Sequence, residues 1–144
     1  WILAQRLVRK LCPDCREDYD VVKDLNEIAG DAGLVSGRIL TYRAVEGNVS
    51  CTTCHGVGYA GRIPIAELLV SDRTIRGLMH KGCMEYDEYY NAALKGGMIP
   101  MFNDAIIRAF KGETTIREVL KKVSLNEIVE RREMVQKAID SYRG

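Results

Sequence analysis

Two cysteine pairs with fixed spacing constrain this sequence more than any other feature. Cys12 and Cys15 form one CxxC motif, Cys51 and Cys54 form a second, and 35 residues separate the two motifs. Each CxxC turn places two sulfurs on one side of a metal ion, so two turns can supply four thiolates at the corners of a tetrahedron. The pattern predicts a Zn²⁺ site made by all four cysteines. The separation exceeds the usual value of about 15 to 20 residues, so we expect a helix and a strand within it.

A site with four cysteine ligands has no open position for water or substrate, so the predicted zinc is structural and not catalytic. Metal binding then contributes to the free energy of folding. A strong chelator should therefore loosen the β-containing part of the chain.

Three other interpretations of the cysteines compete with zinc. Residues 51–55 spell the CxxCH pattern of covalent haem attachment, but haem would leave Cys12 and Cys15 without a role and requires export. Residues 51–58 also resemble one CxxCxGxG element of the Hsp40 chaperone zinc domain, whereas the first pair lacks such glycines. A redox dithiol is the third alternative. We favour zinc, and assign no function to His55, His80 or Cys83.

Composition narrows the class of protein. The chain has 144 residues, 47% of them hydrophobic, which is enough to bury a core. Lysine and arginine total 21 against 20 acidic residues, so the charge of +1 argues against nucleic acid or anionic lipid as a partner. No run of 18 apolar residues occurs, and arginines interrupt the first ten residues, so we expect neither a membrane span nor a signal peptide. Five cysteines, four of them in CxxC pairs, fit a reducing cytosol.

The pattern of apolar residues predicts the elements of the first half. Apolar residues at helical spacing favour a helix over 2–11, and a fold that begins inside a helix suggests a fragment of a longer protein. A second helix is expected over 21–29, between a candidate cap at Asp20 and a stop at Gly30. Residues 38–44 and 62–70 are rich in β-branched and aliphatic residues and predict two strands that pair antiparallel, with Pro64 restricting its strand to an edge or bulge.

The second half is predicted to be helical. Ser71 or Asp72 can cap a helix, and a stripe formed by Tyr86, Tyr89 and Tyr90 at helical spacing is expected to face a core.

Later helix starts are marked by proline and by capping boxes. Pro100 can open a helix that runs through residue 110. Thr115 with Glu118, and Ser124 with Glu127, have the capping-box spacing. The last helix carries an apolar face of Leu125, Ile128, Val129, Val135, Ile139 and Tyr142.

These elements predict an α+β fold that is mostly α. A small antiparallel β element, with a pair of zinc knuckles that together supply four cysteines, occupies a zinc-binding subdomain over residues 1–70. A C-terminal helical bundle forms a second subdomain over residues 71–144.

Several motifs resemble one family when they are taken in order. They are LAQRLVRKLCPDC at 3–15, CTTC at 51–54, GYAGR and IAELL at 58–62 and 65–69, Ile75-Arg76 with Leu78, and GETTIREVL at 112–120. Together they resemble the ATPases of type II secretion and type IV pilus assembly, over about residues 2–123. The sequence departs from that pattern at Ile63-Pro64, at Ala105, and in the extension over 124–144.

The resemblance implies a hexameric cytoplasmic motor, peripheral to the inner membrane, that extrudes pilin or pseudopilin subunits. Its RecA-like core, which binds ATP and Mg²⁺, would lie upstream of this region. The implied partners are that core, neighbouring subunits of the homohexamer and inner-membrane platform proteins. Cys12, Cys15, Cys51 and Cys54 inherit the zinc-ligand role, and no catalytic residue can be carried over.

The sequence itself contains no phosphate-binding GxxxxGK[ST] motif, so the isolated chain is not expected to hydrolyse ATP. We therefore expect a structural and interaction region of a larger motor. The alternative is a stand-alone zinc-ribbon-like domain that binds nucleic acid. That alternative calls for clustered basic residues, whereas the basic residues here are mixed with acids.

Overall fold

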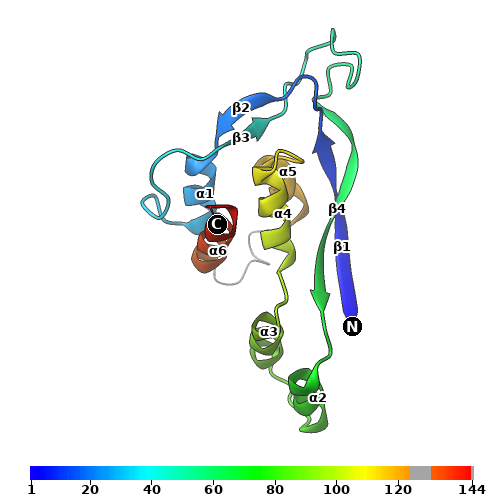
Figure 1. Cartoon of the computed structure of the whole chain (residues 1–144), viewed down its shortest axis with the longest axis vertical. Helices are drawn as coiled ribbons and strands as arrows, with labels where there is room; N and C mark the ends of the chain where they lie inside the picture. Colours follow the sequence, from blue (N-terminus) through cyan, green and yellow to red (C-terminus); the bar gives the residue numbers. More distant parts are fainter. Residues whose placement is uncertain (124–130, 144) are drawn as a thin grey trace.

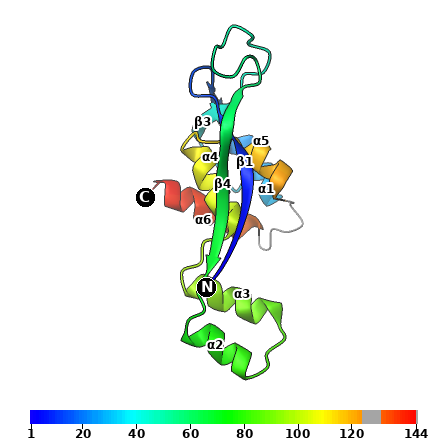
Figure 2. The same ribbon diagram turned by 90° about the vertical axis from the view of Figure 1, so that its right-hand side faces the viewer.

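The computed structural model describes residues 1–123 and 131–143. Its longest feature is an antiparallel ribbon of two strands, β1 (Ile2–Leu11) and β4 (Tyr59–Leu69), which runs along the side of the molecule (Figure 1). In this register Val8 lies opposite Ile63 and Leu7 opposite Pro64, and the register shifts between Arg9 and Leu11. In Figure 1 the helices of the core lie along one side of the ribbon, and in the turned view of Figure 2 the ribbon lies in front of them.

The prediction of a helix over residues 2–11 is wrong, because this segment is strand β1. Leu3 and Leu7 are four residues apart, which places them on the same face of a strand as well as of a helix. In the strand both are exposed, while the side chain of Val8 points to the other face and is fully buried. The spacing therefore did not discriminate between the two structures, and the pairing with β4 decided between them.

A second antiparallel pair joins β2 (Glu17–Asp20) to β3 (Leu40–Arg43). The strands predicted at 38–44 and 62–70 both exist as β3 and β4, but the prediction that they pair with each other is wrong. Each pairs with an earlier strand that the pattern did not indicate. Within the described residues β4 has one neighbour, so Pro64 does lie in an edge strand, where its missing N–H breaks no ladder on the open side.

Helix α1 (Val22–Ala29) confirms the prediction for residues 21–29 to within one residue. The Oδ1 atom of Asp20 accepts a hydrogen bond from the N–H of Val22 at 3.1 Å, although Val21 occupies the cap position. Gly30 ends the helix at φ 67°, in the left-handed conformation that glycine adopts without strain.

The helical second half is also confirmed. The N–H of Ile75 donates to the Asp72 side chain at 2.8 Å, and the N–H of Glu118 donates to that of Thr115 at 3.0 Å, so both predicted caps form. The capping box at Ser124 lies outside the described residues. The helices are α2 (Arg73–His80), α3 (Tyr86–Lys95), α4 (Met101–Phe110), α5 (Ile116–Lys122) and α6 (Arg131–Arg143).

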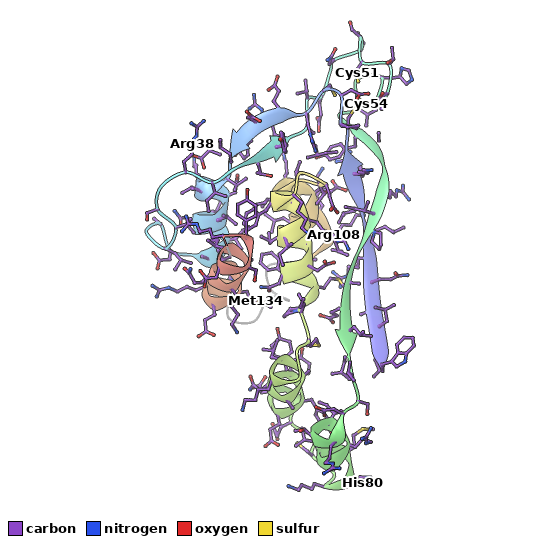
Figure 3. All side chains as sticks on the ribbon, in the orientation of Figure 1. Arg38, Cys51, Cys54, His80, Arg108 and Met134 are labelled. Carbon is purple, nitrogen blue, oxygen red and sulfur yellow. The ribbon has the colours of Figure 1, made fainter. Side chains whose placement is uncertain are left out.

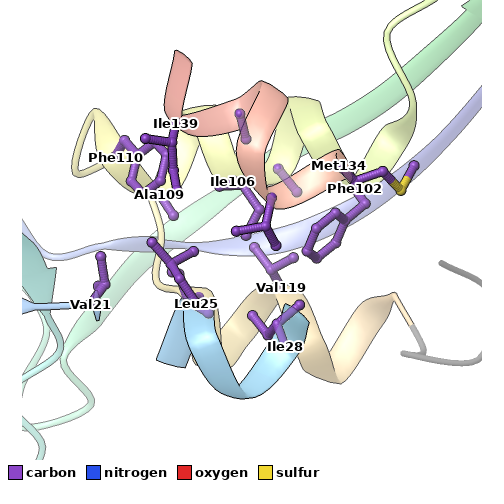
Figure 4. Packing of buried hydrophobic residues seen from close by; sticks show 14 of the residues in the cluster. Val21, Leu25, Ile28, Phe102, Ile106, Ala109, Phe110, Val119, Met134 and Ile139 are labelled. Atoms are coloured by element: carbon purple, nitrogen blue, oxygen red, sulfur yellow. The ribbon is translucent and has the colours of Figure 1, made fainter. Parts of the chain in front are cut away.

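Helix α4 runs through the hydrophobic core, between the β1–β4 ribbon on one side and α1 with α6 on the other (Figure 4). The hydrophobic core takes buried side chains from both parts of the sequence. Residues before position 70 supply some of them, and helices α4, α5 and α6 supply others. The division into two subdomains at residue 70 stays a prediction. Among the buried residues are Val8, Val21, Leu25, Ile28, Ile65, Phe102, Ile106, Phe110, Val119, Met134, Val135 and Ile139.

Helices α2 and α3 form a hairpin at the far end of the ribbon (Figures 1 and 2). The Tyr86 and Tyr90 rings stack with centroids 5.7 Å apart, but Tyr86 is 66% exposed. The prediction that the tyrosine stripe faces a core is therefore wrong for Tyr86, because this hairpin buries little more than Ile75 and Ala93. In the described ranges, no helix is long and apolar enough to cross a membrane.

Candidate metal centre

The four predicted ligands converge at the end of the molecule opposite the α2–α3 hairpin (Figure 3). Cys12 directly follows β1 and Cys15 lies in the next turn, while Cys51 and Cys54 lie in the turn before β4. The Cys12 and Cys51 sulfurs are 3.7 Å apart, and the Cys15 and Cys54 sulfurs are 3.4 Å apart. All four Sγ atoms lie within 4.8 Å of one another.

Backbone hydrogen bonds hold the two turns together. The N–H of Cys12 donates to the carbonyl of Gly58 at 3.1 Å, and the N–H of Gly58 donates to the Cys54 sulfur at 3.3 Å. Within the second turn, the N–H of His55 donates to the carbonyl of Cys51 at 2.9 Å. Gly58 has φ 78°, and a Cβ atom there would lie 3.0 Å from Ala44. The position therefore favours glycine both by its backbone conformation and by the space around it.

The sulfur positions fit a tetrahedral ion. Zinc–sulfur bonds of about 2.3 Å place the sulfurs of a regular tetrahedron about 3.8 Å apart. Two of the six sulfur–sulfur separations, 3.7 Å and 3.4 Å, are close to that value, and all six are within 4.8 Å. The cluster could hold a metal ion, and four thiolates are the donor set of a closed zinc site.

Burial and hydrogen bonding shift the pKa values of these thiols in different directions. Burial raises the pKa of Cys12 and of Cys15, because a thiolate away from water is poorly solvated. Burial also acts to raise the pKa of Cys54, but the N–H of Gly58 and the neighbouring thiols outweigh it and lower that pKa to about 6. A bound cation would stabilise all four thiolates in this position.

Of the residues behind the alternative interpretations, Cys51 and Cys54 lie in the cluster and His55 lies outside it. His55 is exposed at φ 49°, and the sulfurs of Cys51 and Cys54 approach those of the first pair. Cys83 lies between α2 and α3, where its sulfur is 3.3 Å from a carboxylate oxygen of Glu88. No disulfide joins the five cysteines.

A polar cluster links the base of the site to α5, and the sequence did not reveal it. The Arg9 guanidinium donates to Glu118 at 2.8 Å and lies 3.9 Å from the centre of the Tyr59 ring. The Tyr59 hydroxyl is 3.1 Å from the Thr115 hydroxyl. The capping-box spacing predicted that Glu118 would turn back toward Thr115, but its carboxylate binds Arg9 instead. Only the tertiary structure brings these residues together, since Arg9 and Glu118 are 109 positions apart.

Comparison of the sequence with known proteins identifies the family of this chain. The model of the family described as "Type II/IV secretion system protein" matches residues 1–121. This chain belongs to that family. The matched region includes both cysteine pairs and the Arg9–Glu118 contact.

Curated members of the type II/IV secretion family are similar over the same region. The chain is 38% identical over 120 residues to the type II secretion system protein E of Dickeya dadantii, covering 83% of this chain and 22% of that protein. It is 36% identical over 121 residues to the type IV pilus assembly ATPase PilB of Thermus thermophilus, covering 84% of this chain and 13% of that protein. It is 38% identical to the type II secretion system protein HxcR of Pseudomonas aeruginosa over 120 residues, covering 83% of this chain and 20% of that protein. The chain thus spans about a fifth or less of these relatives.

Proposed function

We propose that this chain is the zinc-binding structural and interaction region of a hexameric cytoplasmic ATPase that powers pilus assembly or type II secretion. The observation that carries the proposal is the cluster of four cysteine sulfurs within a region matched by the secretion family. In this account Cys12, Cys15, Cys51 and Cys54 hold one structural Zn²⁺. ATP and Mg²⁺ bind in an upstream core, and the chain alone does not hydrolyse ATP.

The zinc would fix the free end of the β1–β4 ribbon. Cys12 continues β1 and the Cys51–Cys54 turn leads into β4, so an ion between them joins the two strands at one end. With no ion, the long connection between the strands would be held mainly by β2–β3 pairing and α1 packing. A ribbon fixed in this way can transmit a displacement along its length without its strands separating.

The outer face of the β1–β4 ribbon has exposed apolar side chains that could contact another part of the motor. Leu3 and Leu68 lie opposite each other and are 51% and 44% exposed, and Leu7 beside Pro64 is 51% exposed. Exposed apolar side chains in a row mark a surface that another body covers. We propose that the upstream ATPase core packs on this face, with neighbouring subunits and inner-membrane platform proteins as further partners in the assembled cytoplasmic motor.

The proposal is tested in the longer protein that carries this region. We expect Cys12→Ser with Cys51→Ser to remove zinc and to abolish pilus assembly or secretion, because the ribbon loses its fixed end. Cys83→Ser is the matched control and should leave both zinc content and assembly unchanged, since Cys83 lies outside the cluster. Normal assembly by the double variant after verified loss of zinc would refute the structural role.

A further inference from the structure

A groove of about 950 Å³ lies between helix α1, the β2–β3 sheet and helix α5, apart from the cysteine cluster. Its floor includes several apolar side chains. Val21, Tyr59 and Ile116 are buried at the base, and Tyr19, Tyr42, Val45 and Leu120 line the same groove as half-buried side chains. The half-buried side chains offer contact area to apolar side chains from outside the molecule.

The rim of the groove carries an excess of negative charge. Asp24 and Glu27 are three residues apart on α1 and line the same side, and Glu46 lines the groove from the segment after β3. Within the described part of the chain, neither Glu27 nor Glu46 makes a salt bridge. The remaining carboxylate, Glu17, is already paired with Arg43 at 2.9 Å.

One cation on the rim does not balance these carboxylates. Arg117 lines the groove and is exposed, and it is the basic residue of the lining besides the paired Arg43. The groove therefore combines an apolar floor with a net negative rim. A ligand that matches it carries apolar groups beside positive charges.

The groove is open to solvent, which narrows the class of ligand. Glu17, Glu27, Arg43, Glu46 and Arg117 all line it and are all exposed. Sites for small molecules bury most of the ligand surface, which an open groove does not do. An open apolar groove instead suits one face of a polypeptide segment, whose other face stays in water.

We propose that this groove binds a short amphipathic segment of a partner protein, with its apolar face on Tyr19, Val45 and Leu120 and its lysines or arginines against Glu27 and Glu46. The interaction is additional to the motor function and does not rest on the zinc site. Because much of the attraction is electrostatic and exposed, binding weakens as ionic strength rises.

The test uses the full 144-residue chain, isotope-labelled for NMR, and two synthetic peptides about two heptads long. One peptide contains leucine and lysine at amphipathic helical spacing, and the other has glutamate in place of every lysine. We expect the lysine peptide to shift the amide signals of α1, α5 and residues 42–46, and to bind at least about tenfold more tightly than the glutamate peptide.

Two double variants with the same change in net charge make the result specific. Glu27→Lys with Glu46→Lys should weaken binding of the lysine peptide at least about tenfold. Glu133→Lys with Asp140→Lys, on the exposed side of α6, should leave it unchanged. The proposal is overturned if the lysine peptide fails to bind, if its shifts fall on the outer face of the β1–β4 ribbon, or if both double variants bind alike. Amide spectra of the free variants that differ from the wild type only near the substituted residues establish that they fold.

Discussion

Among the described residues, Glu118 is the charged residue with the most deeply buried side chain, and two hydrogen bonds join it to Arg9 near the start of the chain. Its side chain is 2% exposed and accepts hydrogen bonds from both the backbone N–H and the guanidinium of Arg9. Burial acts to raise the pKa of Glu118, but the contacts with Arg9 outweigh this and lower it. A carboxylate that is buried and paired is costly to leave unpaired.

Glu118→Gln should therefore destabilise the fold by about 1–2 kcal/mol, a value reduced because Arg9 is partly exposed. The control is Glu17→Gln, which removes the carboxylate that pairs with Arg43. Both side chains of this pair are exposed, so the substitution should reduce stability by less than about 0.5 kcal/mol. Urea unfolding of both variants measures the difference. Equal losses for the two would show that burial of Glu118 contributes nothing.

The same carboxylate predicts how stability depends on pH. Because the pKa of Glu118 is lower in the folded state, its contribution to stability is present above the unfolded pKa of about 4.3 and is lost as pH falls through the folded pKa. The difference in unfolding free energy between the wild type and Glu118→Gln should hold steady from neutral pH to about pH 5 and shrink below it. A difference that persists unchanged to strongly acid pH would contradict this assignment.

At the scale of elements, the turn between α4 and α5 depends on a glycine. Gly112 has φ 72°, and a Cβ atom there would lie 2.4 Å from the Tyr42 ring, which packs under the guanidinium of Arg16. Arg16 also donates to the carbonyl of Gly112 at 2.7 Å. The turn thus brings the β2–β3 sheet and the two helices into contact at a place where no side chain fits.

Gly112→Ala should destabilise the fold by about 2–4 kcal/mol, from the strained φ and from the clash with Tyr42. Gly37→Ala is the matched control, because Gly37 has φ 85° and open space around it, and should cost only about 1 kcal/mol. Thermal or urea unfolding separates the two effects. A loss at Gly112 no larger than that at Gly37 would mean that Tyr42 moves aside freely.

Local signals predicted most helices but fewer of the strands. The caps at Asp72 and Thr115 and the stop at Gly30 use contacts within a few residues, so the sequence alone indicates them. Strand β1 was predicted as a helix, and β2, with its sequence Glu-Asp-Tyr-Asp, was not predicted at all. Both acquire their conformation from partners at least 20 residues away, which a periodicity over a short window cannot reveal.

The candidate metal site was predictable only in part. The CxxC spacing identified the four cysteines that the structure brings together. It gave no information on the ribbon beneath them or on the Arg9, Tyr59 and Glu118 cluster, because those contacts join residues that are far apart in the sequence.

At the scale of the whole molecule, local stability should vary along the long axis. Helix α4 buries six of its residues within the core, whereas α2 and α3 bury one each. Regions with few buried apolar contacts open more readily. We expect amide hydrogens of α2 and α3 to exchange much faster than those of α4 in the isolated chain. Equal protection of the three helices would contradict this picture.

The zinc proposal concerns the opposite end of the molecule, where a single ion would hold both strands of the ribbon. The most direct test is the metal content of the purified chain, with its thiols counted before and after chelation. The account predicts one zinc per chain and four thiols that react only once the zinc is removed, with Cys83 reactive throughout. The control is purification under reducing conditions with zinc supplied. If the chain then contains no zinc and all of its thiols react at once, the account is contradicted.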